Sequence, residues 1–254
     1  MSSELYLAAR NLNLTFPSYT YKNRSIKDLF VSSLSPLAFK TNKLDRAILK
    51  NININFYKGE RVGILGLNGS GKTTLCRCLS QKIKTTEGSV YFKHKPMALI
   101  QTEAGFLGEL SAYENLDLFS KFLYSDLSEK DRQELIQEAL AFCGIGSQIH
   151  NPIEQYSLGM KSRLALAFIT TFSHEILILD EVYNHTDLFF REKMKTRMEK
   201  QIRDSNLVII VSHYEDDFIE YCSRGIVLDQ GKVAYDGPIS SAIKAYHFFN
   251  KVDS

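Results

Sequence analysis

The segment between residues 66 and 73 constrains the fold of this chain more than any other feature. It reads GLNGSGKT and fits the pattern G-x-x-x-x-G-K-[ST], directly after the apolar run RVGILG of residues 61–66 and before a predicted helix over residues 75–83. A glycine-rich turn between a strand and a helix presents successive backbone N–H groups at the positive end of the helix, where phosphates bind. The pattern therefore predicts a phosphate-binding loop in an α/β protein.

Each polar residue of this loop has an expected task. Lys72 reaches the outer phosphates as a catalytic cation, and the Thr73 hydroxyl binds Mg²⁺. The residues expected to contact the nucleotide are Gly66, Leu67, Asn68, Gly69, Ser70, Gly71, Lys72, Thr73 and Thr74.

A second group of residues supplies the chemistry that a phosphate loop lacks. The apolar run EILIL of residues 175–179 ends in Asp180 and Glu181. Asp180 is expected to hold Mg²⁺ indirectly, and Glu181 to orient and polarise a water molecule for attack on the γ-phosphorus. Residues 97–100 and 207–211 are equally continuous apolar runs, which predicts a parallel sheet covered on both faces.

Helical patterns divide the rest of the chain. Residues 112–124 and 128–142 are predicted helices, the second opening with Ser128 and an acid three residues later. We expect them to belong to a helical subdomain, at about residues 104–172, inserted into a single domain that spans residues 1–254. Residues 226–229 and 233–235, joined by a Gln-Gly turn at residues 230–231, predict a hairpin, and Pro238 is expected to open a last helix. Residues 26–34 form an amphipathic stretch that predicts a surface helix.

The charge balance and the apolar content limit the possible partners. With 31 basic and 29 acidic residues the net charge is +2, which argues against nucleic-acid binding through bulk positive charge. The longest uncharged stretch, residues 139–153, would span roughly 22 Å as a helix, short of a bilayer core of roughly 30 Å. The N-terminal residues MSSE lack the regions of a secretion signal, so we expect the chain to stay in the cytoplasm.

A motif between these groups resembles that of a known family. Residues 156–163 read YSLGMKSR, similar to the Leu-Ser-Gly-Gly-Gln signature, with a following Arg, of the ATP-binding subunits of ABC transporters. Ser157, Gly159 and Arg163 match it, whereas Tyr156, Leu158 and Met160 depart. The other interpretation, a serine-capped core helix, rests on the same hydroxyl and free N–H groups. In the family this signature contacts the γ-phosphate of ATP held by a second subunit, so the resemblance implies a homodimer.

The resemblance covers residues 5–248 and implies further site residues. Gln101 falls at the position that links Mg²⁺ and the attacking water to the helical subdomain, and Asp187 matches the aspartate after the Asp-Glu strand. His213, at the end of the run 207–211, occupies the place of the histidine that touches the γ-phosphate. Phe16 stands where an aromatic residue stacks on adenine; Tyr19 and Tyr21 are alternatives. The implied fold is an α/β P-loop NTPase core with the helical subdomain and an N-terminal antiparallel β region.

Within the family, the chain looks most like the ATPases that export O-antigen, capsule or teichoic acid. Residues 103–106 (EAGF) with Glu109 and Leu110, the Tyr-Ser-x-Gly-Met signature, and the segment at about residues 17–46 carry this resemblance. The resemblance implies that the chain binds ATP and Mg²⁺, works with a separate integral-membrane ABC-2 type permease and binds no nucleic acid. It also implies a peripheral position at the cytoplasmic face of the inner (cell) membrane, with residues 17–46 as the segment near the membrane. Some such ATPases carry a carbohydrate-binding domain after the ATPase, which we do not expect in a 254-residue chain.

Two alternatives differ in class. Residues 42–45 read NKLD, the guanine-recognition pattern of GTPases, but that motif belongs after the phosphate loop and this copy precedes it. Tighter binding of GTP than of ATP would favour it. A soluble ABC ATPase with a non-transport role is the other alternative, although the chain shows neither two ATP-binding units nor a long coiled coil. Co-purification with an integral-membrane protein would separate that alternative from transport.

Overall fold

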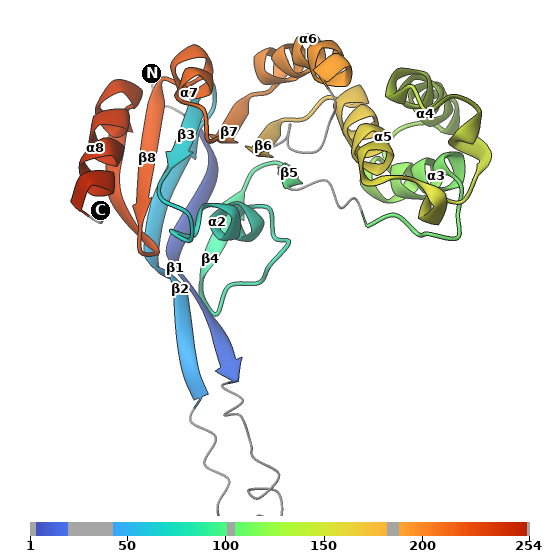
Figure 1. Cartoon of the computed structure of the whole chain (residues 1–254). Coiled ribbons are helices and arrows are strands. Elements are labelled where there is room, and N and C mark those ends of the chain that lie inside the picture. The colour runs from blue at the N-terminus through green and yellow to red at the C-terminus, as the bar shows by residue number, and fades with distance from the viewer. Residues whose placement is uncertain (1–3, 20–42, 101–104, 182–187, 253–254) are drawn as a thin grey trace, which may run out of the picture.

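The computed structural model describes residues 4–19, 43–100, 105–181 and 188–252, arranged as two sheets with helices around them (Figure 1). The larger sheet has six strands in the order β5-β6-β7-β3-β8-β9, of which only β9 is antiparallel to its neighbour. Its strands are β3 Arg61–Leu65, β5 Met97–Ile100, β6 Ile176–Asp180, β7 Leu207–Val211, β8 Arg224–Asp229 and β9 Lys232–Pro238. Every residue of β6 and β7 is buried, as expected for continuous apolar runs in a sheet covered on both faces.

The smaller sheet is antiparallel and has the order β2-β1-β4, with β1 Leu5–Tyr19, β2 Lys43–Tyr57 and β4 Glu87–Phe92. Helix α2, Lys72–Leu79, packs between the two sheets. Leu75 and Leu79 of this helix share one buried cluster with Leu7 and Phe56 of the small sheet and Ile178 of the large one. The helix that follows the glycine-rich loop is thus held on both sides.

Helices α6 Leu188–Asp204, α7 Glu215–Tyr221 and α8 Ile239–Val252 supply the core on the opposite face of the large sheet. Met194 and Met198 of α6, Phe218 of α7 and Ala242 of α8 are buried against strand residues such as Val208. Among the described residues, no helix combines the length and the apolar character needed to cross a membrane.

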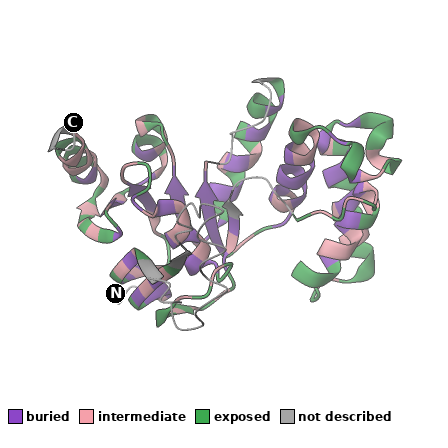
Figure 2. Ribbon diagram, turned by 60° about the horizontal axis from the view of Figure 1, so that its bottom comes forward, coloured by how far each residue is buried: buried purple, intermediate pink, exposed green. Residues whose placement is uncertain are grey.

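A helical lobe projects from one end of the large sheet (Figures 1 and 2). It comprises α3 Ala112–Leu123, α4 Glu129–Cys143, α5 Leu158–Thr171 and the short 3₁₀ turns η1 Gly146–His150 and η2 Ile153–Gln155. The lobe has a buried cluster of its own, which includes Leu116, Ile136 and Leu164. The lobe thus has its own hydrophobic core, and the end of α5 is hydrogen-bonded to Gln201 of α6.

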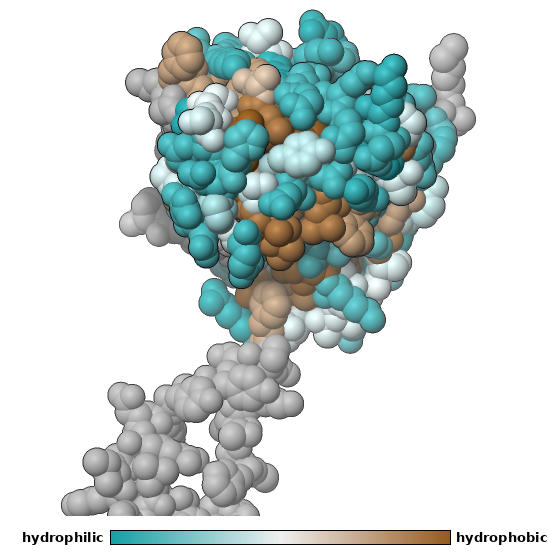
Figure 3. Space-filling model, turned by 90° about the vertical axis from the view of Figure 1, so that its right-hand side faces the viewer, coloured by the Kyte–Doolittle hydropathy of each residue, from teal (hydrophilic) through white to brown (hydrophobic). Residues whose placement is uncertain are grey.

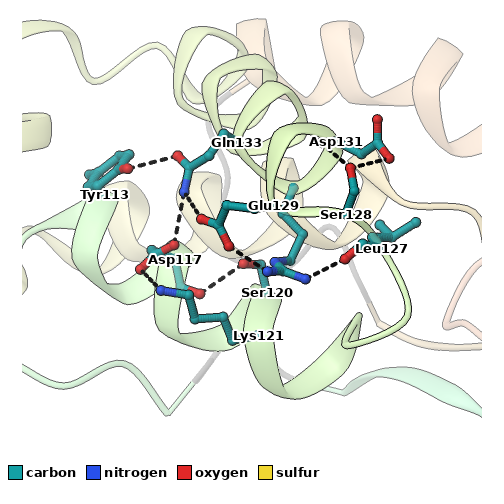
Figure 4. A network of polar contacts seen from close by, with 10 residues as sticks. Tyr113, Asp117, Ser120, Lys121, Leu127, Ser128, Glu129, Asp131 and Gln133 are labelled. Carbon is teal, nitrogen blue, oxygen red and sulfur yellow. Dashed lines mark hydrogen bonds and ion pairs between the residues drawn. The ribbon is translucent and has the colours of Figure 1, made fainter.

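A polar network fastens α3 to α4 on the lobe surface (Figure 4). Gln133 donates to Asp117 and Glu129 at 3.0 Å each and accepts from the Tyr113 hydroxyl at 2.7 Å. The Asp131 N–H bonds the Ser128 hydroxyl at 3.2 Å, so the predicted serine cap of the second lobe helix is confirmed.

Two sequence-based boundaries were wrong. Helix α2 begins at Lys72 and ends at Leu79, rather than covering residues 75–83, because the loop turns directly into the helix and Gln81 has a φ of 57°. Pro238 ends β9 opposite Arg224 and does not open α8. The predicted surface helix at residues 26–34 lies outside the described residues.

The hairpin turn between β8 and β9 supports the glycine-rich loop. Gln230 and Gly231 have φ of 44° and 80°, so the predicted Gln-Gly turn is confirmed. The Gly231 N–H donates to the Ser70 carbonyl at 3.1 Å, and its carbonyl accepts from the Lys50 N–H at 2.8 Å. A Cβ at Gly231 would stand 2.1 Å from the Ile48 carbonyl oxygen. Only glycine lets this turn approach both the loop and β2.

We expect Gly231→Ala to lower the free energy of unfolding by about 2 kcal/mol or more, because it adds a backbone clash to the strain of a left-handed residue. Gly59→Ala is the matched control: Gly59 has a φ of 87° but open space where its Cβ would lie. It should cost only about 1 kcal/mol. Urea denaturation measures both, and equal losses would contradict the role of the Gly231 contact.

Candidate functional site

The parallel register brings four chain segments to one edge of the large sheet. In β6, Asp180 is level with Val211 of β7 and with Ile100 of β5, while Gly63 of β3 is level with Ile210. The residues that follow these strands therefore emerge side by side. They are the glycine-rich loop after β3, Glu181 after β6 and His213 after β7. Gln101 directly follows β5 in the chain, but it lies outside the described residues, as does Asp187.

The glycine-rich loop forms a compact nest between β3 and α2. Gly66, Gly69 and Gly71 have φ of 151°, 81° and 107°. A Cβ on Gly66 would stand 2.4 Å from the Leu228 carbonyl oxygen, whereas the space beside Gly69 is open. The loop is therefore closed toward the sheet and open on the side where a phosphate would enter.

The Lys72 ammonium group lies within this nest. Its Nζ donates to the carbonyls of Gly66 at 2.7 Å and Leu67 at 3.1 Å, and the residue is only 8% exposed. Burial lowers the pKa of Lys72, while the negative charges of Glu181 and Asp180 oppose that shift. Partial desolvation strengthens the attraction of such a cation for an incoming anion.

Asp180 is a buried carboxylate at the end of β6. Asp180 is 1% exposed, and neither carboxylate oxygen accepts a hydrogen bond of normal geometry from the described residues. Burial raises the pKa of Asp180; the neighbouring Thr73 hydroxyl and the charge of Lys72 lower it. A carboxylate beside a hydroxyl is the oxygen donor set that Mg²⁺ prefers. The residues present therefore fit that ion, whose charge would compensate a carboxylate buried in the core.

Glu181 and His213 meet at the same edge. His213 Nε2 lies 2.6 Å from Glu181 Oε1. Glu181 has a φ of 52°, and its N–H donates to the Val211 carbonyl at 3.1 Å, which extends the pairing of β6 with β7 by one residue. The left-handed backbone of Glu181 turns the chain immediately after the strand. This pair offers a carboxylate that can accept a proton and an imidazole beside it.

The signature residues lie in the helical lobe and not at this edge (Figure 1). Ser157 caps α5, its hydroxyl accepting from the Met160 N–H at 3.2 Å. Gly159 is in the first turn of the same helix, and the Leu158 side chain is 54% exposed. The capped-helix geometry expected of this segment is present, with the helix beginning at Leu158.

Phe16 lies on β1 near the loop and is 44% exposed. Two residues earlier, Leu14 pairs with Leu49, whose side chain lies 3.0 Å from the position of a Cβ on Gly71. Phe16 is therefore two residues along β1 from the strand pair that contacts the glycine-rich loop. The two alternatives for stacking on adenine, the side chain of Tyr19 and Tyr21, lie outside the described part of the chain.

Sequence reasoning did not assign Gly231 to the site. Its bond to Ser70 joins the hairpin to the loop across 161 residues of chain, and only the Gln-Gly turn hinted at a special backbone there. The Leu228 carbonyl packs against Gly66 on the side of the sheet, and no pattern in the sequence predicted this contact.

The family match and the similar proteins agree with one another. The model of a family described as ABC transporter matches residues 49–184. The ABC transporter protein AbcA of Aeromonas salmonicida is 30% identical over 245 residues, 96% of this chain and 77% of that protein. The teichoic acids export ATP-binding protein TagH of Bacillus cereus is 29% identical over 242 residues, 95% of this chain but only 42% of that protein. The ATP-binding protein BexA of Haemophilus influenzae is 30% identical over 213 residues, 84% of this chain and 94% of that protein.

Solved structures share the fold. An ATP-binding cassette determined as a dimer in a post-hydrolysis state with ADP and Pi has a TM-score of 0.68 and 23% identity, covering 92% of this chain and 98% of that one. An ATP-binding subunit of an ABC transporter has a TM-score of 0.69 and 17% identity, covering 95% and 93%. The expected α/β P-loop architecture is confirmed.

Asp180→Asn should raise the free energy of unfolding of the nucleotide-free protein by about 1–2 kcal/mol at pH 7, because it removes a buried charge whose desolvation outweighs the favourable effects of Thr73 and Lys72. The pKa of Asp180 is raised above 3.8 in the folded state. Its ionisation therefore destabilises the fold, and the penalty is absent below pH 3.8, where it is protonated in both states. The gain from Asp180→Asn should accordingly grow as the pH rises from about 4.

Urea denaturation between pH 4 and pH 8 checks this expectation. Asp204→Asn, at the exposed end of α6, controls for the loss of one carboxylate. A stability difference between Asp180→Asn and wild type that shrinks as the pH rises would show that the carboxylate is stabilised in the core.

Proposed function

The chain belongs to the ABC transporter family as an ATP-binding ATPase, and from this membership we propose that it powers a transporter that exports a cell-surface polysaccharide. The observation that carries the ATP-hydrolysing part of the proposal is the meeting of Lys72, Asp180, Glu181 and His213 at one sheet edge. Lys72 can bind the phosphates of a nucleotide, and the buried carboxylate of Asp180 can bind a cation. Glu181, beside His213, can activate a water molecule for attack.

We assign the hydrolytic steps to these residues. The N–H groups of residues 66–74 hold the phosphates, and Lys72 transfers its hydrogen bonds from the Gly66 and Leu67 carbonyls to phosphate oxygens. Thr73, Asp180 and Gln101 hold Mg²⁺, which when bound would offset the charge that develops on the transferred phosphoryl group. Glu181 orients the attacking water and takes up its proton, while His213 contacts the γ-phosphate. Phe16 stacks on the adenine.

Hydrolysis by this scheme needs two copies of the chain. The capped end of α5 lies in the helical lobe and not at the sheet edge of its own chain. The nucleotide site of one copy is therefore completed by the other copy, through its Ser157, Gly159 and Asp187. The N–H groups at that helix end suit an anion, the γ-phosphate of ATP held by the other copy. A solved cassette of the same fold is dimeric, which supports this arrangement.

Transport requires a membrane partner, which we propose to be an ABC-2 type permease. The chain would then be peripheral at the cytoplasmic face of the cell membrane, with residues 17–46 nearest the bilayer. The lobe exposes the large apolar side chains of Leu107, Phe122, Leu123 and Leu158, and a side view shows apolar residues gathered on the lobe face (Figure 3). Exposed apolar patches of this kind suit protein contacts. No nucleic-acid partner is proposed.

Export of a polysaccharide rests on two supports. Several relatives are named teichoic acids export ATP-binding proteins, and the Tyr-Ser-x-Gly-Met signature resembles that group. The alternative, a soluble ABC ATPase without a transport role, predicts ATP turnover but no membrane partner.

Glu181→Gln should bind ATP normally but lower its turnover by about 100-fold or more, because the water loses its base. ATP should then hold this variant as a dimer in size-exclusion chromatography with light scattering. Lys72→Ala should bind ATP weakly and stay monomeric, since the phosphates lose a charged partner. Glu220→Gln on exposed α7 is the control and should hydrolyse ATP as the wild type does. Undiminished turnover by Glu181→Gln would refute the assigned base.

The export role is tested in the cells from which the chain comes. Deleting its gene should remove a surface polysaccharide, and a plasmid copy should restore it, whereas the Glu181→Gln copy should not. The wild-type protein should co-purify with an integral-membrane protein. Normal surface polysaccharide in the deletion strain, with the ATPase recovered free of membrane proteins, would favour the soluble alternative.

A further inference from the structure

We propose that Asp217 positions His213 for hydrolysis, acting through the hydroxyl of Ser212. This inference rests on the proposed role of His213 and adds two residues, on α7 and in the loop before it, that make no contact with the nucleotide. In this arrangement Asp217 and Ser212 are positioning residues.

The hydrogen bonds around His213 form a clamp, which we define as Ser212, Tyr214 and Asp217. The Ser212 hydroxyl donates to Asp217 Oδ2 and accepts from the Tyr214 N–H at 3.0 Å. His213 is the residue between the two loop members of the clamp. One hydroxyl thus closes the backbone on both sides of His213 and ties it to the first turn of α7.

The packing beside this loop leaves an open space. A cavity of about 90 Å³ lies next to it, with apolar walls from Leu179, Met198, Ile202 and Tyr221. Ser212, His213, Tyr214 and Asp217 also line this cavity, as does Glu181. His213 and Tyr214 are both exposed on their other sides. A segment with a cavity on one side and solvent on the other depends on hydrogen bonds for its position.

The position of the loop matters because His213 has a partner at short range. Its Nε2 lies 2.6 Å from Glu181 Oε1, so a small rotation of the loop would separate the imidazole from the carboxylate. A displacement of about 1 Å at a reacting group can cost about 100-fold in rate. Loss of the clamp should therefore slow the chemical step and leave the phosphate-binding loop untouched.

The acidic first turn of α7 supplies its own control. Glu215, Asp216 and Asp217 all lie there, and each negative charge is favourable near the positive end of a helix. Asp216 is exposed, whereas Asp217 bonds the Ser212 hydroxyl. Replacing Asp216 and Asp217 separately therefore distinguishes a general charge effect from the clamp.

The experiment measures kcat and KM for ATP with the full-length chain and Mg²⁺. Ser212→Ala and Asp217→Ala should each lower kcat by about 10- to 100-fold and change KM by less than about twofold. Ser212→Thr keeps the hydroxyl and should remain within about threefold of wild type. Asp216→Ala should leave kcat unchanged. The double variant Ser212→Ala/Asp217→Ala should be no slower than Ser212→Ala alone, because Ser212→Ala already removes the hydrogen bond to Asp217.

Several results would overturn the inference. A kcat for Asp217→Ala equal to that for Asp216→Ala would do so, as would a double variant slowed by the product of the single effects. Thermal unfolding identifies a variant that does not fold, and the nearly isosteric Ser212→Ala then decides the matter alone. If Glu181→Gln is inactive while Ser212→Ala turns over normally, only the clamp fails. If wild type hydrolyses no ATP, the proposed function itself fails.

Discussion

The parallel register of β3, β5, β6 and β7 is the constraint on which the rest of this molecule depends. Parallel strands all end at the same edge, so residues distant in the chain emerge together there. A shift of one residue in β6 against β7 would turn Asp180 toward the other face of the sheet. Because every residue of both strands is buried, such a shift would also disturb the core on both sides.

The same edge holds a cation and a carboxylate that do not bond directly to each other. Lys72 bonds two carbonyls of its own loop, and Asp180 has no hydrogen-bond partner among the described residues. A direct pair between them would satisfy both, but the Lys72 hydrogen bonds point to the loop instead. The fold therefore keeps a cation and an anion close together, each available to a partner that carries the opposite charge. The surrounding core, from both sheets and α2, provides the stability that offsets this arrangement.

The helical lobe is joined to the sheet side mainly through α6. Gln201 donates to the Thr170 and Phe172 carbonyls at 2.8 Å each, at the end of α5. Phe142 of α4 lies against α6, with Arg197 and Lys193 placed 4.1 and 4.2 Å from its ring centre. These contacts connect α4 and α5 of the lobe with α6, the helix that follows β6 in the chain. Movement of the lobe must either carry α6 with it or break them.

Local sequence patterns were sufficient for the glycine-rich loop, the buried strands and the capped helices. The order of residues 66–73, the apolar runs ending at Asp180 and Val211, and the serines at 128 and 157 each dictate structure through neighbours in the chain. The sequence also placed Glu181 and His213 at strand ends. It did not predict the start of α2, the hydrogen bonds of Lys72, the support of Ser70 by Gly231 or the link from Ser212 to Asp217. These depend on which carbonyls, hydroxyls and cavities meet in space, and only the packed tertiary structure decides that, because spacing along the chain does not encode the side on which distant segments approach.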